Sequence, residues 1–259
     1  MIKKEKIFYF GYSLRLLEEL LESGLYEVLG VVTQKGKYTE DFRILCLEHE
    51  INFYIVSNKQ ELTHCCEDLK IEKVVMYEFG IIIPQRLCEI INIVNIHPGN
   101  LNNNRGANPI TWSILLPEIG AMMSVYRIFG DIDCGELISS KNIEILPDDT
   151  CSTLKSRMEN IIGILLVDVW EYFCNNKNIK TITTNGGIYR RRVCEEDYTI
   201  NRNSDTVDSM KRKINSQDRY RGAIWYECGK QKYAKSYKQI GKELHIFFDD
   251  NSEICILDD

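Results

Sequence analysis

Residues 93–98 read IVNIHP, an apolar run that ends in an Asn-Ile-His-Pro step. A short apolar run closed by proline and glycine is typical of a buried strand in a parallel sheet. Side chains alternate along a strand, so Asn95 and His97 point to one side while Ile96 faces away. Ligands of open parallel sheets bind outside the carboxyl ends of the strands. The stretch therefore predicts a strand whose end carries two polar groups at a ligand-binding edge.

The chain before this stretch repeats one pattern, in which a short apolar run precedes a segment with helical spacing. Strand-like runs lie at 7–10, 28–32, 51–56, 74–77 and 93–96, and helix-like segments at 14–24, around 42–49 and at 58–69. Strands that alternate with helices at this rhythm specify a mostly parallel sheet covered on both faces. The sequence thus predicts an α/β, Rossmann-like fold.

After this stretch the sequence pattern changes twice, first to longer strands with an apolar helix and then to a β-rich tail. Two longer strands are predicted at 122–129 and 137–145, joined by the tight turn GDIDCG at 130–135, and one apolar helix at 152–174. Beyond the polar stretch 175–188 we predict a helix at 205–215 and strands at 222–228, 231–236, 243–248 and 253–257. We therefore expect a catalytic domain over 1–180 and a small β-rich domain over 181–259 with a substrate or dimer role.

The charge and the thiols limit the class of protein. The net charge of −6 and the lack of a long basic run disfavour nucleic-acid binding. The ten cysteines are scattered without a CxxC pair, and no segment has the length of a signal or membrane-spanning helix, so we expect a cytoplasmic protein with reduced thiols. The four histidines do not fall at ligand spacing with the cysteines, so we expect no metal.

Three polar groups can converge at the predicted edge of the sheet. Asn95 and His97 end one strand, and Asp133 lies in the turn that closes the next pair. An amide and an imidazolium can stabilise an oxyanion, and a carboxylate keeps the imidazolium charged and oriented. Taken singly, the histidine is more often a loop residue and the aspartate a turn former. Their combination favours a catalytic site.

The spaced set of motifs resembles the formyltransferases that use N10-formyltetrahydrofolate. The resemblance covers residues 5–176, and the matching residues are Asn95, His97, Pro98, Arg105, Gly106, Pro109, Asp133 and Gly135. It implies catalysis by Asn95, His97 and Asp133, without a metal. It also implies that backbone groups hold the folate, from Tyr77, Phe79, Gly80, Ile81, Ile82, Ile83, Asp131 and Ile132.

Within that family, residues 104–109 followed by Trp112 look most like the sugar N-formyltransferases. This likeness implies a dTDP-linked 3-amino or 4-amino dideoxy sugar as acceptor, a role in O-antigen or lipopolysaccharide biosynthesis, and a homodimer. Candidate substrate-binding residues are Tyr12, Ser13, Arg105, Gly106, Tyr220 and Trp225. Capping of a helix by Ser13, bracing of the loop by Arg105, and core packing of Tyr220 or Trp225 are the structural alternatives.

Two alternatives stay open, and the chain also departs from the family. The acceptor could be methionyl-tRNA or a small amine such as glycinamide ribotide, because lysines and arginines gather in the tail at 211–213, 219 and 221. The protein could also bind folate or a sugar nucleotide without turnover. Gly99 replaces the family's serine after His-Pro, Tyr126 stands where many relatives have histidine, and Cys134 where many have threonine.

Overall fold

The computed structural model of the chain describes residues 3–129, 131–174, 182–184 and 187–257. Contacts divide the chain into two compact units. Unit 1 consists of Met1–Arg105, Met122–Lys141 and Met158–Ile188, and unit 2 of Gly106–Ala121, Asn142–Arg157 and Tyr189–Asp259. The domain boundary expected near residue 180 stays a prediction, whereas the contacts group two earlier segments with the C-terminal residues.

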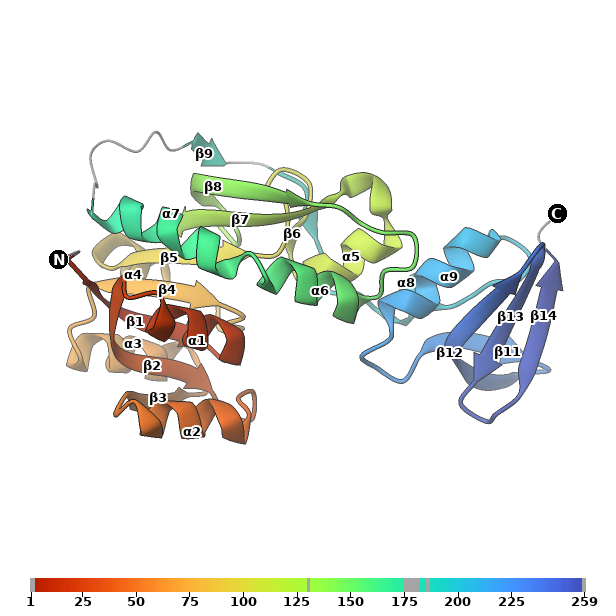
Figure 1. Cartoon of the computed structure of the whole chain (residues 1–259), viewed down its shortest axis with the longest axis horizontal. Helices are drawn as coiled ribbons and strands as arrows, with labels where there is room; N and C mark the ends of the chain where they lie inside the picture. Colours follow the sequence, from red (N-terminus) through yellow and green to blue (C-terminus); the bar gives the residue numbers. More distant parts are fainter. Residues whose placement is uncertain (1–2, 130, 175–181, 185–186, 258–259) are drawn as a thin grey trace. The chain divides into compact units, whose positions relative to one another are not determined.

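Unit 1 is built on a sheet with the strand order β3-β2-β1-β4-β5-β7-β8-β9 (Figure 1). The strands are β1 (Glu5–Gly11), β2 (Tyr26–Gln34), β3 (Asn52–Val56), β4 (Lys73–Tyr77), β5 (Asn92–His97), β7 (Ala121–Ile128), β8 (Gly135–Ile143) and β9 (Ile182–Thr184). Neighbours from β3 to β5 pair in parallel, and β7 joins β5 antiparallel. The structure confirms the mostly parallel sheet.

Helices cover both faces of this sheet. They are α1 (Leu14–Glu22), α2 (Glu40–Glu48), α3 (Lys59–Asp68), α4 (Gln85–Ile90) and α7 (Ile162–Cys174). Phe10 of β1 packs in a core cluster with Leu62 of α3 and Leu87 of α4. Its neighbour Tyr9 contacts Phe42 of α2, with ring centroids 6.1 Å apart. Because alternate side chains of a strand face opposite ways, α2 lies on the face opposite α3 and α4.

The single helix predicted over 152–174 is wrong, because the chain forms α6 (Cys151–Glu159) and then α7. The break falls at residues 160–161, where the amide of Ile161 bonds the carbonyl of Met158 at 3.3 Å. Asn160 and Gly163 are weak helix formers, which gives the break a local cause. The apolar periodicity continues across the break and therefore hid it. Figure 1 shows α1 and α7 in front of the unit 1 sheet, and the two helices contact each other.

Unit 2 contains a four-stranded antiparallel sheet in the order β11-β12-β13-β14. Its strands are β11 (Ala223–Glu227), β12 (Lys230–Ile240), β13 (Glu243–Phe248) and β14 (Glu253–Leu257), and its helices include α5 (Pro109–Leu115), α8 (Glu195–Tyr198) and α9 (Val207–Ser216). Met210 and Ile214 of α9 share a core with Leu244, Ile246 and Phe248 of β13. The predicted β-rich character of the C-terminal residues is confirmed. Strand β12 continues four residues beyond the predicted end at 236.

Three separated chain segments meet in unit 2. Helix α5 packs against α9. The thiol of Cys151 lies 3.6 Å from Oγ1 of Thr111 and 3.4 Å from the carbonyl oxygen of Ser216. Two further short elements, β6 (Arg105–Gly106) and β10 (Tyr189–Arg190), pair with each other. Across the residues that the structure describes, we find no helix with the length and apolarity that a membrane span requires.

Candidate active site

The antiparallel register of β5 and β7 assembles one polar cluster at the end of β5. Asn95 is the register partner of Tyr126, and His97 the partner of Ser124. The exposed fractions are 7% for Asn95, 5% for His97 and 1% for Tyr126. Such burial strengthens hydrogen bonds between these groups and makes any unpaired polar atom costly. The cluster is therefore built to hold a fixed arrangement.

Tyr126 connects two of the predicted catalytic residues. Nδ2 of Asn95 donates to the Tyr126 hydroxyl at 2.9 Å, and the hydroxyl donates to Oδ1 of Asp133 at 2.8 Å. The same Oδ1 lies 3.8 Å from Nδ1 of His97. Burial first, and then the nearby Asp133 carboxylate, raise the pKa of Tyr126 well above its ordinary value. The phenol therefore stays protonated at neutral pH and donates to Asp133.

The other ring nitrogen of His97 is held by the loop that follows β5. Nε2 lies 3.0 Å from the carbonyl oxygen of Asn104, which can only accept, so Nε2 donates. A Cβ at Gly99 would lie 2.6 Å from both of these atoms. Oγ of Ser124 donates to the Gly99 carbonyl at 2.7 Å and fixes this segment. The glycine that departs from the family's serine is thus required by the close packing over His97.

The turn after β7 presents the Asp133 carboxylate. Asp133 has a left-handed backbone with φ of 51°, and the amide of Cys134 donates to the carbonyl of Asp131 at 3.1 Å. Gly135 has φ of +155°, and a Cβ there would lie 1.9 Å from the carbonyl oxygen of Arg127. The glycine of the Asp-x-Gly motif is therefore required by the backbone, because only glycine lets β8 begin so close to β7.

The predicted folate segment starts at Tyr77, the last residue of β4, and continues over 78–83 as irregular chain outside helix and sheet. Tyr77 is fully buried, and the ring of Phe79 lies 5.4 Å from that of Phe10. The amide of Gly80 donates to Oε1 of Gln34 at 2.6 Å. Ile81 and Ile83 pack against the core, while Ile82, Asp131 and Ile132 are exposed. The segment is anchored by apolar side chains and begins beside the end of β5.

Tyr12 and Ser13, the predicted substrate contacts, follow the end of β1, and Ser13 makes contacts within the fold. Oγ of Ser13 accepts from the amide of Leu16 at 3.4 Å and caps α1. The Ser13 amide donates to the Tyr9 hydroxyl at 3.0 Å, so this group is already engaged. Tyr12 is half-buried. Capping, the structural alternative for Ser13, is what the contacts favour.

Arg105 and its neighbour brace the loop. The Arg105 guanidinium donates to Sγ of Cys134, and its amide donates to the Ile188 carbonyl at 3.2 Å. After Gly106, the amide of Ala107 donates to the Arg190 carbonyl at 3.3 Å. These contacts tie the residues after His97 into place, which agrees with the bracing alternative.

The two aromatic candidates of the tail differ in exposure. Trp225 is 4% exposed and lies 5.8 Å from the ring of Phe248, inside the core of unit 2. This enclosure agrees with core packing, the structural alternative for Trp225. Tyr220 is 58% exposed. Of this pair, only Tyr220 keeps a surface role open.

The chain is similar in sequence to proteins of known function. A sequence model of the family described as "Formyl transferase" matches residues 16–170. The chain is 28% identical over 222 residues to a methionyl-tRNA formyltransferase of Dehalococcoides mccartyi, with 80% of this chain and 71% of the relative covered. Family membership rests on the first of these matches.

Solved structures share the fold. A sugar N-formyltransferase from Shewanella superimposes with a TM-score of 0.71 at 17% identity, covering 92% of this chain and 99% of the other. HypX from Aquifex aeolicus in complex with tetrahydrofolic acid gives a TM-score of 0.67 at 14% identity, covering 97% of this chain. The present chain spans only 46% of that HypX chain. Likeness at such identities supports the fold alone.

Proposed function

The chain belongs to the formyl transferase family of enzymes, and on that premise we propose that it transfers a formyl group from N10-formyltetrahydrofolate to the amine of a dTDP-linked amino-dideoxy sugar. One observation carries the proposal. The buried Asn95 and His97 at the carboxyl end of β5 lie in one cluster with the half-buried Asp133, which contacts Asn95 through Tyr126 and lies 3.8 Å from His97. A protein that only binds its ligands does not need that combination of groups.

We assign a role to each group of the cluster. The donor supplies an electrophilic formyl carbon, and attack by the sugar amine places negative charge on the formyl oxygen. The Asn95 amide and the Nδ1–H of protonated His97 donate to that oxygen. The Asn104 carbonyl holds Nε2, so the ring keeps one orientation. Asp133 lies beside Nδ1, stabilises the imidazolium and collects the proton that leaves the amine. Collapse of the tetrahedral intermediate then breaks the bond between the formyl carbon and N10, and N10 takes up that proton as tetrahydrofolate leaves.

The residues after β4 suit a folate donor. A pterin needs directional hydrogen bonds and an apolar slot, and residues 78–83 offer irregular backbone anchored by Phe79, Ile81 and Ile83. These residues begin where β4 pairs with β5, because Met76 is the register partner of Asn95. The donor's reactive carbon would thus lie near the catalytic groups.

The charge pairing of unit 2 favours a nucleotide sugar over tRNA. The lysines and arginines of the tail are the reason to consider tRNA as the acceptor, yet several of them form ion pairs with carboxylates. Nζ of Lys213 lies 2.6 Å from Asp205, and Arg221 lies 3.7 Å from Asp249. Phosphate binding by basic residues requires cations that are available to neutralise the backbone. A nucleotide sugar carries only two negative charges, so its binding requires fewer unpaired cations than tRNA binding does.

Methionyl-tRNA is the second candidate acceptor. The observation in its favour is the sequence similarity, since the relative that is 28% identical is a methionyl-tRNA formyltransferase. The chemistry at Asn95 and His97 would be the same for either amine. Only the acceptor distinguishes the two proposals.

The acceptor is identified by a direct assay. Purified protein with N10-formyltetrahydrofolate and a panel of dTDP-linked 3-amino and 4-amino sugars is expected to release tetrahydrofolate and to add the mass of one formyl group to one sugar. Charged initiator tRNA and glycinamide ribotide serve as the competing acceptors. Formylation of tRNA with no sugar product would replace the sugar proposal, and no turnover on any amine would leave only a binding protein.

A second prediction concerns Tyr126. Tyr126→Phe keeps the ring but removes the hydroxyl that joins Asn95 to Asp133. Loss of a hydrogen bond to a charged group costs about 1.5 kcal/mol, so we expect kcat/KM to fall about tenfold. Tyr54→Phe, on β3 and away from the cluster, is the matched control. Unchanged kcat/KM in Tyr126→Phe would mean that the bridge does not position the catalytic groups.

A further inference from the structure

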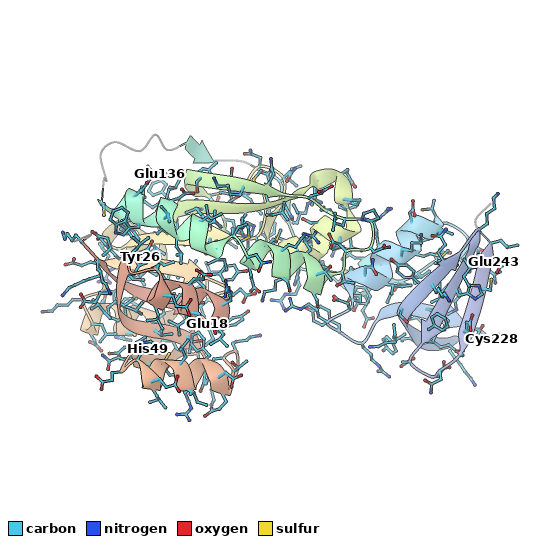
Figure 2. All side chains as sticks on the ribbon, viewed as in Figure 1. Glu18, Tyr26, His49, Glu136, Cys228 and Glu243 are labelled. Carbon is cyan, nitrogen blue, oxygen red and sulfur yellow. The ribbon has the colours of Figure 1, made fainter. Side chains whose placement is uncertain are left out.

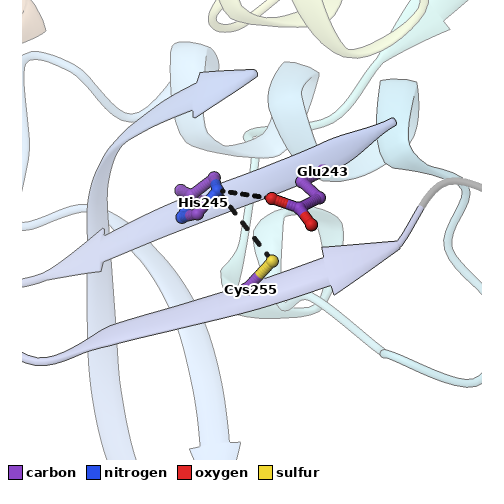
Figure 3. A group of neighbouring side chains, drawn as sticks. All are labelled: Glu243, His245 and Cys255. Carbon is purple, nitrogen blue, oxygen red and sulfur yellow. Dashed lines mark hydrogen bonds and ion pairs between the residues drawn. The ribbon is translucent and has the colours of Figure 1, made fainter. Parts of the chain in front are cut away.

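A second cluster of chemically active side chains lies on the outer face of the small sheet. Figure 3 shows Glu243 and His245 on β13 and Cys255 on β14. Alternate residues of β13, Leu244 and Ile246, are fully buried in the core of unit 2. Side chains alternate along a strand, so Glu243 and His245 share the opposite face. His245 is the register partner of Cys255, which brings the thiol to the same face.

The ligand atoms are close to the spacing of a metal site. Nε2 of His245 lies 3.4 Å from Oε2 of Glu243 and 4.0 Å from Sγ of Cys255. One oxygen, one nitrogen and one sulfur atom all lie within 4.8 Å of one another. Bonds of about 2.0–2.3 Å to zinc place tetrahedral ligands roughly 3.3–3.7 Å apart. Rotamer changes at three surface side chains can supply the remaining contraction.

A fourth residue orients the imidazole. Nδ1 of His245 lies 2.5 Å from Oε1 of Glu253 on β14. An ionised carboxylate only accepts, so Nδ1 donates and Nε2 is the atom that faces Glu243 and Cys255. Histidine ligands of zinc commonly donate their second N–H to a carboxylate in this way. Such an outer partner distinguishes the cluster from three neighbouring surface residues.

We propose that Glu243, His245 and Cys255 bind one Zn²⁺, with water as the fourth ligand and Glu253 as the partner of Nδ1. A thiolate, an imidazole and a carboxylate suit zinc, whereas calcium and magnesium prefer oxygen ligands alone. The ion would join β13 to β14 and stabilise the outer strand of the sheet. It takes no part in the proposed formyl transfer, and the two proposals fail independently.

The neighbouring charges permit a cation. Glu243 and Glu253 place two carboxylates at the site, and Lys238 of β12 is the register partner of His245 on the same face. The hydrogen bond that Nδ1 donates to the Glu253 carboxylate raises the pKa of His245. A proton therefore competes with the metal at Nε2 in mildly acidic solution, so binding is best measured at mildly alkaline pH.

Cobalt provides a spectroscopic test on the full chain. The protein is stripped with a chelator, kept reduced with a phosphine and titrated with Co²⁺. We expect one equivalent to give a thiolate-to-cobalt band and the visible bands of four-coordinate Co²⁺, and Zn²⁺ to abolish both. Cys255→Ser should remove the thiolate band, and His245→Gln the stoichiometric binding. Glu253→Gln should weaken binding about 10- to 100-fold.

Matched variants separate this site from the other thiols and histidines. Cys228 is an exposed cysteine of the same unit, placed apart from Glu243 in Figure 2, and His49 is the C-cap of α2 in unit 1. Cys228→Ser and His49→Gln should bind Co²⁺ as the parent does. A thiolate band that persists in Cys255→Ser, or no stoichiometric binding in the parent, would overturn the proposal and leave an ordinary surface ion-pair cluster. Circular dichroism confirms that each variant is folded.

Discussion

Replacing His97 by asparagine is expected to lower kcat/KM for formyl transfer by about 10²- to 10⁴-fold, the usual contribution of a positioned general acid. Asparagine keeps polarity and approximate size but cannot carry the positive charge that faces the formyl oxygen. Its amide nitrogen matches Nδ1 and not Nε2, so the single contact of Nε2 with the Asn104 carbonyl, now 3.0 Å, is the one that is lost. The protein should therefore remain folded while chemistry slows.

Single-turnover rates with preformed donor complex measure this effect directly, beside the melting temperature. His64→Gln, at an exposed position of α3, is the matched control and should leave the rate unchanged. The proposed role of His97 fails if the variant turns over at the parental rate. A variant that is inactive because it is unfolded would be recognised by its lost thermal transition.

The second large effect is expected at Gly135. Gly135→Ala places a Cβ 1.9 Å from the Arg127 carbonyl, so the turn must open and carry Asp133 away from Tyr126. Strain of this kind costs about 3 kcal/mol, with a corresponding loss of activity because Asp133 leaves the site. Denaturant unfolding and kcat/KM measure the two consequences separately.

Gly24 supplies the control for this substitution. It also has a left-handed backbone, with φ of +68°, but a Cβ there would meet no atom within 4 Å. Gly24→Ala should therefore cost about 1 kcal/mol, the conformational penalty alone. Equal destabilisation by the two variants would show that the close approach at Gly135 contributes nothing.

Local sequence was sufficient for most elements of the fold. Short apolar runs ended by glycine or proline predict β1 to β5 because burial on both faces and turn chemistry are both local signals. The sequence predicts one helix where α6 and α7 form, because the apolar spacing continues through Asn160. The spacing of apolar residues does not report the backbone hydrogen bonds that end α6. Helix propensity at Asn160 and Gly163 was the only available signal.

The site was predictable in part. Asn95 and His97 follow from strand alternation, and Asp133 from the turn that must close the next strands. The sequence does not place Tyr126 in the site, because its position opposite Asn95 depends on the register of β5 against β7. The cysteine and histidine of the proposed zinc site are joined by strand register as well, so linear spacing did not reveal them.

The three-part construction of unit 2 has a consequence for synthesis of the protein. Helix α5 is made early, yet the helix it packs against, α9, begins at Val207. Until the ribosome has delivered that later segment, the side of α5 that packs against α9 lacks its native cover. Contacts between such distant residues form slowly. A nascent chain that stalls after α5 and before α9 would expose this uncovered side of α5, and chaperones recognise exposed apolar surface of this kind.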